Sequence, residues 1–206
     1  RQQGGQQQIT GPAAAGGHQA ARRRCFLPPG MVCYNRTGGT PMLENAFSPD
    51  GMIVRQSLAT DVPYGRYPSS RNGCGWIATY NLLRAVGRPQ TPEAVRARLA
   101  KTLLFGGRFG TQLYAMLWML HRAGVRFTVT FSRRRILLAV REGRSGLLLY
   151  RWKRYGHYIV FTPGETGERL LNCSEYESGS ARTLDGLFKK VRPWLTAAVI
   201  VKEDRP

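Results

Sequence analysis

The sequence predicts an α+β domain, because helical and strand periodicities occupy separate parts of the chain. Between residues 74 and 123 apolar residues recur at helical spacing, whereas from residue 125 onward they alternate with polar residues or form short runs. Helices followed by several short strands indicate helices packed on a mostly antiparallel sheet. The 206 residues, 42% hydrophobic and 10% aromatic, are sufficient for one sizeable core.

Three regions differ in composition. Residues 1–24 are rich in Gln, Gly and Ala and end in three arginines, which is typical of a flexible tail. Residues 25–51 contain Pro, Gly and isolated apolar residues, which predicts an irregular segment that wraps around the domain. We therefore assign the folded domain to residues 52–206.

The first predicted helix begins at Cys74. Its apolar positions cover nearly the whole circumference, so we expect it to be buried on most sides. Gly87 ends this helix, and Thr91-Pro92-Glu93 opens a second one that runs to about residue 103. A third helix is expected over residues 111–123.

The strands follow. Apolar and polar residues alternate over 125–131, and further strands are predicted at 147–152, 157–162, 169–173 and 196–202. A short helix is expected between them at 133–141. The Pro- and Gly-containing turn at 163–167 should fold two of these strands into a hairpin.

Cys74 is the first candidate for chemistry. It lies in Asn72-Gly73-Cys74-Gly75-Trp76, where a loop becomes a buried helix. Unpaired backbone N–H groups and the positive end of the helix dipole favour a thiolate, so we expect the pKa of Cys74 to be lowered. The alternative is a buried cysteine that packs as a small hydrophobic residue.

His157 and Asn172 are the other two candidates. His157 begins a predicted strand after a glycine turn, where its imidazole could accept the thiol proton. If the 163–167 turn forms a hairpin, Asn172 returns to the same end of the sheet, and its amide oxygen could orient the ring. A solvent-facing histidine is the alternative.

These residues resemble a known family. Asn-Gly-Cys-Gly-Trp at a helix start, followed by Gly-His-Tyr-Ile-Val-Phe on a strand and Leu-Leu-Asn after a turn, is similar to the papain-like cysteine peptidases, nearest to the bacterial C39-like branch. The resemblance covers residues 52–203 and implies a papain-like fold. It also implies that Cys74 is the nucleophile, His157 the base and Asn172 the orienting residue.

The sequence departs from that family at the oxyanion hole. Such enzymes usually place a Gln a few residues before the nucleophile, whereas here position 68 is Pro and the nearest upstream Gln is Gln56. The candidate donors are therefore Asn72, Gln56 and the backbone N–H of Cys74. Losing one such donor costs on the order of 10²–10³ in rate, so a weakly active relative is one expectation.

A net charge of +19 suggests anionic partners without naming one. Basic residues cluster between 122 and 154 with aromatic residues among them, and the candidates for anion binding are Arg133, Arg134, Arg135, Arg151, Lys153 and Arg154. This surface could bind an acidic protein substrate, nucleic acid or an anionic surface. A solvated basic face is the alternative.

Other classes are disfavoured. The apolar runs are too short for a transmembrane helix, and four scattered cysteines with three histidines favour neither a metal site nor a disulfide framework. We expect no cofactor. No apolar signal-peptide core is visible in the first residues, which leaves both a cytoplasmic and a secreted location open.

Three hypotheses therefore follow from the sequence. The first is a cysteine peptidase that hydrolyses peptide or isopeptide bonds through a thioester on Cys74. The second is an acyl transferase of the transglutaminase type, or a deamidase, on the same fold. The third is a basic module that binds nucleic acid or other anions on a catalytically weak scaffold.

Overall fold

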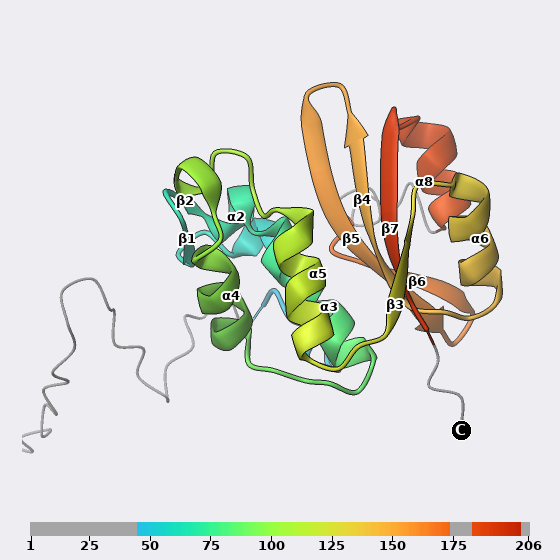
Figure 1. The fold of residues 1–206 in the computed structure, drawn as a ribbon, viewed down its shortest axis with the longest axis horizontal. Helices are drawn as coiled ribbons and strands as arrows, with labels where there is room; N and C mark the ends of the chain where they lie inside the picture. Colours follow the sequence, from blue (N-terminus) through green and yellow to red (C-terminus); the bar gives the residue numbers. More distant parts are fainter. Residues whose placement is uncertain (1–44, 174–182, 203–206) are drawn as a thin grey trace, which may run out of the picture. The chain divides into compact units, whose positions relative to one another are not determined.

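The fold was analysed in a computed structural model that describes residues 45–173 and 183–202. The predicted tail at 1–24 and most of the segment at 25–51 lie outside these residues. The described part is an α+β structure with six α-helices and a five-stranded antiparallel sheet, which confirms the predicted class (Figure 1).

The central sheet has the strand order β3-β7-β4-β5-β6, and each neighbouring pair among the described residues is antiparallel. Its strands are β3 (Phe127–Thr130), β4 (Gly146–Trp152), β5 (Tyr155–Gly164), β6 (Gly167–Leu171) and β7 (Leu195–Val201). β5 and β6 form the predicted hairpin, with Gly164 opposite Gly167 at its turn. This hairpin brings residue 172 back toward the beginning of β5.

One face of the sheet packs against α3 (Cys74–Ala85) and the elements around it. Residues 75–83 of α3 are all buried, as its apolar circumference predicts. α4 (Pro92–Ala100) and α5 (Leu113–Arg122) pack on α3, and α2 (Ser69–Asn72) leads into it. The Thr91 side chain accepts a hydrogen bond from the Ala94 N–H, which confirms the predicted cap of α4.

The opposite face of the sheet is covered by α6 (Arg133–Arg141) and α8 (Leu184–Val191) (Figure 1). Apolar residues of both helices form a second core with alternate residues of β4 and β5. The sheet is therefore buried on both faces. This explains why its central strands are continuous apolar runs rather than alternating patterns.

The remaining elements are short. A 3-10 turn, η1 (Gln56–Leu58), and a two-stranded ribbon of β1 (Pro63–Tyr64) and β2 (Tyr67–Pro68) precede α2, and a second turn, η2 (Leu104–Gly107), lies between α4 and α5. None of these elements, nor α8, was predicted from the sequence.

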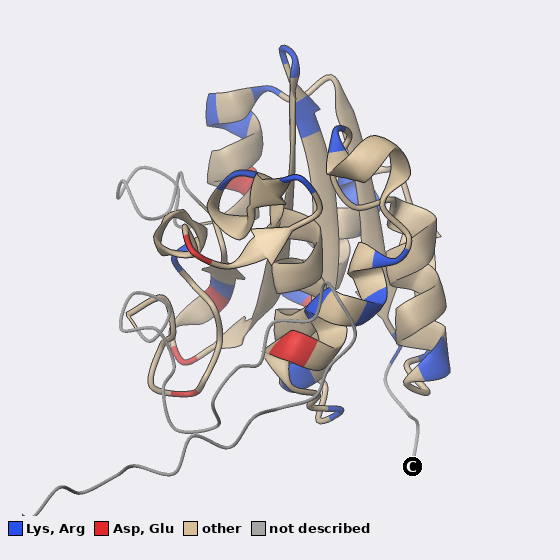
Figure 2. Ribbon diagram, turned by 90° about the vertical axis from the view of Figure 1, so that its left-hand side faces the viewer, with Lys and Arg blue, Asp and Glu red and all other residues tan. Residues whose placement is uncertain are grey.

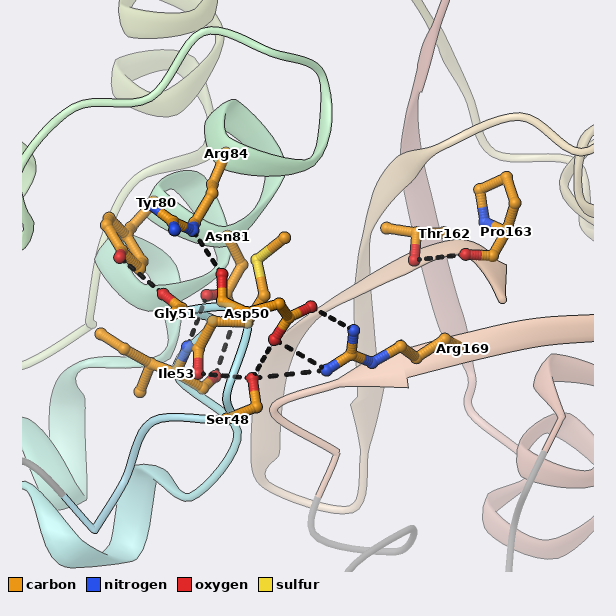
Figure 3. Close-up of polar contacts among 11 residues, drawn as sticks. Ser48, Asp50, Gly51, Ile53, Tyr80, Asn81, Arg84, Thr162, Pro163 and Arg169 are labelled. Atoms are coloured by element: carbon orange, nitrogen blue, oxygen red, sulfur yellow. Dashed lines mark hydrogen bonds and ion pairs between the residues drawn. The ribbon is translucent and has the colours of Figure 1, made fainter. Parts of the chain in front are cut away.

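The described end of the wrapping segment is attached to α3 and β6 (Figure 3). The Asn81 side chain makes two hydrogen bonds of 2.8 Å with the backbone of Ile53, and the Tyr80 hydroxyl donates to the Gly51 carbonyl. Asp50 forms an ion pair of 2.5 Å with Arg169 of β6. These contacts hold residues 50–53 against the domain.

No helix within residues 45–173 and 183–202 combines the length and apolar character that crossing a membrane requires.

Candidate active site

Cys74 is the first residue of α3, as predicted. Gly73 precedes it and offers no side chain to cap the helix. Three backbone N–H groups, those of Cys74 itself, Gly75 and Tyr158, lie close enough to the Cys74 sulfur to act on the pKa of the thiol. Cys74 as a residue is partly exposed, although its thiol is surrounded by protein.

The expected lowering of the Cys74 pKa is wrong. Burial raises the pKa of the thiol above its usual value, and this effect outweighs the three N–H groups, which act in the opposite direction. The resting side chain is therefore a neutral thiol at neutral pH. A nucleophilic role then requires a base that removes the proton as the sulfur attacks.

The thiol lies at the edge of β5, near the backbone of Tyr158. β6 pairs with β5 only as far as Val160, so within the described residues no strand covers positions 155–159 on that side. The backbone of Tyr158 faces this edge, because its carbonyl accepts a hydrogen bond of 3.5 Å from Asn172 Nδ2 and its N–H lies near the Cys74 sulfur. Cys74 and Asn172 thus lie along one edge of the sheet, and the Asn172 carbonyl also contacts His157.

The ring of His157 lies on the sheet face covered by α6 and α8. Its partner on β4 is Tyr150, and the two rings make an edge-to-face contact with centroids 5.9 Å apart. The side chain of Tyr158 points to the other face, toward α3. A proton passing from the thiol to the imidazole must therefore travel around the edge of β5.

The tautomer of His157 follows from its hydrogen bond. Nε2 lies 2.7 Å from the backbone carbonyl oxygen of Asn172. Because a carbonyl oxygen only accepts, Nε2 must carry the hydrogen in the neutral ring, and Nδ1 must carry the lone pair. Nδ1 is therefore the nitrogen that can act as a base.

Asn172 orients His157 through its backbone and not, as predicted, through its side-chain amide. The side chain is buried and donates instead to Gln56 Oε1 at 3.0 Å. The residue has a positive φ of 59°, a conformation that Asn adopts more readily than most residues. This conformation turns the carbonyl of residue 172 toward the ring.

The two predicted side-chain donors of the oxyanion hole have other partners. Gln56 Nε2 donates to the carbonyl oxygens of Ser69 and Ser70, at 3.0 and 3.3 Å, and so ties η1 to the segment before Cys74. Asn72 Nδ2 donates to the Gly107 carbonyl at 2.8 Å. The backbone N–H of Cys74 is the predicted donor that lies directly at the sulfur.

The structure adds Thr111, Tyr64 and Tyr158 to the surroundings of the thiol. The Tyr64 hydroxyl is 2.8 Å from Thr111 Oγ1, and the Tyr158 hydroxyl donates to the Thr111 carbonyl at 3.1 Å. Thr111 packs directly over Gly75, where a Cβ atom would overlap its side chain. Burial raises the pKa of Tyr64 to about 12, so it remains protonated. Of these surroundings, the sequence indicated only Gly75, which directly follows Cys74.

An exposed aromatic pair lies in the same segment. Phe105 and Phe109 are 74% and 67% exposed, and their rings meet edge to face at 5.8 Å. Phe105 has a φ of 50°, which is unfavourable for a residue with a side chain. Gly107 lies between them, and its carbonyl accepts the hydrogen bond from the Asn72 side chain. The pair therefore belongs to a loop fixed to the segment that carries Cys74.

The predicted basic residues fall into two groups. Arg133, Arg134 and Arg135 form the exposed first turn of α6, and Arg151, Lys153 and Arg154 lie at the exposed end of the β4–β5 hairpin. Figure 2 shows how widely Lys and Arg are spread over the described surface and how few Asp and Glu accompany them.

No group of three His, Cys, Asp or Glu side chains in the described part of the chain is arranged to hold a metal ion. Comparison with known proteins finds no matching family model and no matching curated protein.

Proposed function

We propose that this protein is a cysteine hydrolase of papain-like type that cleaves peptide or isopeptide bonds. The observation that supports the proposal is the position of Cys74. Its sulfur lies at the start of a buried helix, close to three backbone N–H groups, one of them that of Tyr158, the residue after His157. His157 Nε2 is in turn fixed on the Asn172 carbonyl.

The reaction begins with a neutral thiol. The Cys74 proton passes around the edge of β5 to His157 Nδ1 while the sulfur attacks the substrate carbonyl. The carbonyl oxygen becomes an oxyanion, for which the Cys74 N–H is the proposed donor. The imidazolium then returns its proton to the leaving amine as the C–N bond breaks, which leaves a thioester on Cys74. A water molecule, deprotonated by His157, hydrolyses that thioester and restores the thiol.

The substrate is expected to be a peptide or protein. Phe105 and Phe109 offer an apolar contact on a loop fixed to the Cys74 segment, while Arg108, exposed between them, offers a positive charge. Peptides with an apolar side chain beside an acidic residue match this combination.

The test is incubation of the full chain with a mixture of synthetic peptides rich in such pairs, followed by mass spectrometry. A hydrolase produces two fragments whose summed mass exceeds that of the parent by one water. Cys74→Ala and His157→Gln should abolish this product, whereas His121→Gln, a change on the exposed end of α5, should not.

Two other products would show that the same thioester serves a reaction other than peptide hydrolysis. An amine crosslink identifies an acyl transferase, and conversion of Gln to Glu identifies a deamidase. Cleavage that persists in Cys74→Ala would refute the assignment of the nucleophile.

A further inference from the structure

We infer that the end of the β4–β5 hairpin, together with the start of β7, is a binding surface for single-stranded nucleic acid. This surface, here termed the hairpin surface, lies outside the cysteine site and does not depend on the proposed hydrolase. It consists of basic and aromatic side chains: Arg133, Arg151, Lys153, Arg154, Arg192, Trp152, Tyr155 and Trp194.

Contacts in the structure join these residues into one surface. Trp194 donates from its backbone N–H to the Arg151 carbonyl at 3.0 Å and from Nε1 to the Lys153 carbonyl at 3.3 Å. The guanidinium of Arg133 donates to the Pro193 carbonyl. The tip of the hairpin and the start of β7 consequently lie at the same end of the sheet (Figure 1). Figure 2 shows basic residues at this tip.

The aromatic side chains of the hairpin surface are open to solvent. Trp194 is 63% exposed and Tyr155 is 65% exposed. Tyr155 also extends a row of rings, since Trp152 lies 5.7 Å from Tyr155 and 5.3 Å from buried Tyr150. Rings that remain this exposed can stack on nucleic-acid bases, which are also flat and polarisable.

The cations of the surface are available to an external anion. Arg133, Arg151, Lys153, Arg154 and Arg192 are all exposed, and none forms an ion pair with an acid within the described residues. Arg151 stacks on Trp194, with its guanidinium carbon 5.2 Å from the ring centroid, so it covers one face of the indole and leaves the other face for a base. Fixed cations between exposed rings match a strand whose phosphates alternate with bases.

Single strands are favoured over duplexes by this arrangement. In a duplex the bases are stacked on one another, and their faces are not accessible to Trp194 or Tyr155. A surface that bound by charge alone would have no use for exposed rings. The ligand class is therefore single-stranded RNA or DNA, bound through phosphates and base stacking with little sequence preference.

The experiment measures fluorescence anisotropy of labelled oligo(U) and oligo(dT) on the full chain across a salt series. Lys153→Gln with Arg154→Gln should weaken binding roughly 10- to 100-fold at low salt and reduce the slope of log K against log salt by about 1.4. The matched control, Arg98→Gln with Lys101→Gln on or beside α4, removes the same charge from a part of the described fold that lies away from the hairpin tip (Figure 1).

The stacking component has its own variants. Trp194→Leu and Tyr155→Leu should each weaken binding by about 5- to 150-fold, while Tyr114→Leu, an equally exposed tyrosine on α5, should not. Thermal unfolding shows whether each variant is folded. If Trp194→Leu does not fold, Tyr155→Leu provides the test of base stacking.

Three outcomes would overturn the inference. One is equal weakening by the hairpin pair and the α4 control pair, which would indicate attraction to net charge only. Another is duplex binding as tight as single-strand binding and unaffected by the aromatic variants. The third is binding to vesicles containing phosphatidylglycerol with none to oligonucleotides, which would identify a membrane-surface site.

Discussion

Replacement of Asn172 by glycine separates the two roles that this residue could have. Glycine keeps the backbone carbonyl that accepts from His157 Nε2 and tolerates the positive φ of 59°. It removes the side-chain hydrogen bonds to Gln56 Oε1 at 3.0 Å and to the Tyr158 carbonyl at 3.5 Å. The variant thus tests whether backbone or side chain holds the imidazole.

The magnitudes follow from these contacts. Leaving a half-buried amide oxygen without its donor costs about 1–3 kcal/mol. The extra flexibility of glycine in the unfolded chain and the relief of the left-handed conformation are each about 1 kcal/mol and act in opposite directions. We therefore expect a loss of about 1–3 kcal/mol in unfolding free energy and a decrease in Tm of roughly 2–12 °C for a chain of this size.

Activity should respond much less than stability does. Because the carbonyl of residue 172 remains, kcat/KM for a peptide identified as a substrate should change by less than about tenfold at a temperature where the variant is folded. Circular dichroism gives the Tm, and ¹⁵N NMR of the ring reports whether Nε2 still carries the hydrogen.

A different result would refute the backbone assignment. In a triad whose side chain orients the imidazole, replacing that side chain costs about 10⁴ in rate. A loss of that size in folded Asn172→Gly, restored in Asn172→Asp, would show that the side chain turns to the ring during catalysis.

Three further predictions concern residues around this site and the ion pair between Asp50 and Arg169 of β6. Gly75→Ala places a methyl group on the Thr111 side chain, so we expect a loss of about 1–3 kcal/mol in chemical denaturation, relieved in part by adding Thr111→Gly. Because burial raises the pKa of Cys74, its alkylation by iodoacetamide should still be accelerating at pH 9, and a rate plateau below pH 6 would contradict this. The hydrogen bond from Arg169 lowers the pKa of Asp50 from 3.8 to about 2; its stabilisation is therefore complete above pH 4 and lost as the pH falls through about 2. Since the pair is exposed, Asp50→Asn should cost no more than about 1 kcal/mol at pH 7 and nothing near pH 1, as measured by urea unfolding.

The elements with strong local signals could be predicted from the sequence. α3 and α6 have the boundaries expected at Cys74 and Arg133, and Thr91 caps α4. α8 was missed although Thr183 caps it and Leu184, Leu187 and Phe188 form its apolar face. A glycine at position 186 and the short length of the helix obscured that pattern.

The geometry of the site depends on longer-range contacts. The β5–β6 hairpin was predictable from its turn, and with it the approach of residue 172 to His157. The use of the Asn172 carbonyl was not, because it depends on a positive φ and on Gln56, more than a hundred residues away in the chain. The raised pKa of Cys74 likewise reflects packing by α3, Tyr64 and Tyr158, which helix-dipole reasoning alone does not include.

The pairing of Cys74 with His157 is tested most directly by acyl transfer to the sulfur. The full chain is mixed with p-nitrophenyl acetate at neutral pH, and acetylation of Cys74 is followed over time by mass spectrometry in wild type, His157→Gln and the control His121→Gln. We predict that His157→Gln slows acetylation of Cys74 by about 10²–10⁴ while the control matches wild type. Equal rates in all three proteins would show that the imidazole does not serve the thiol, and the hydrolase proposal would fail.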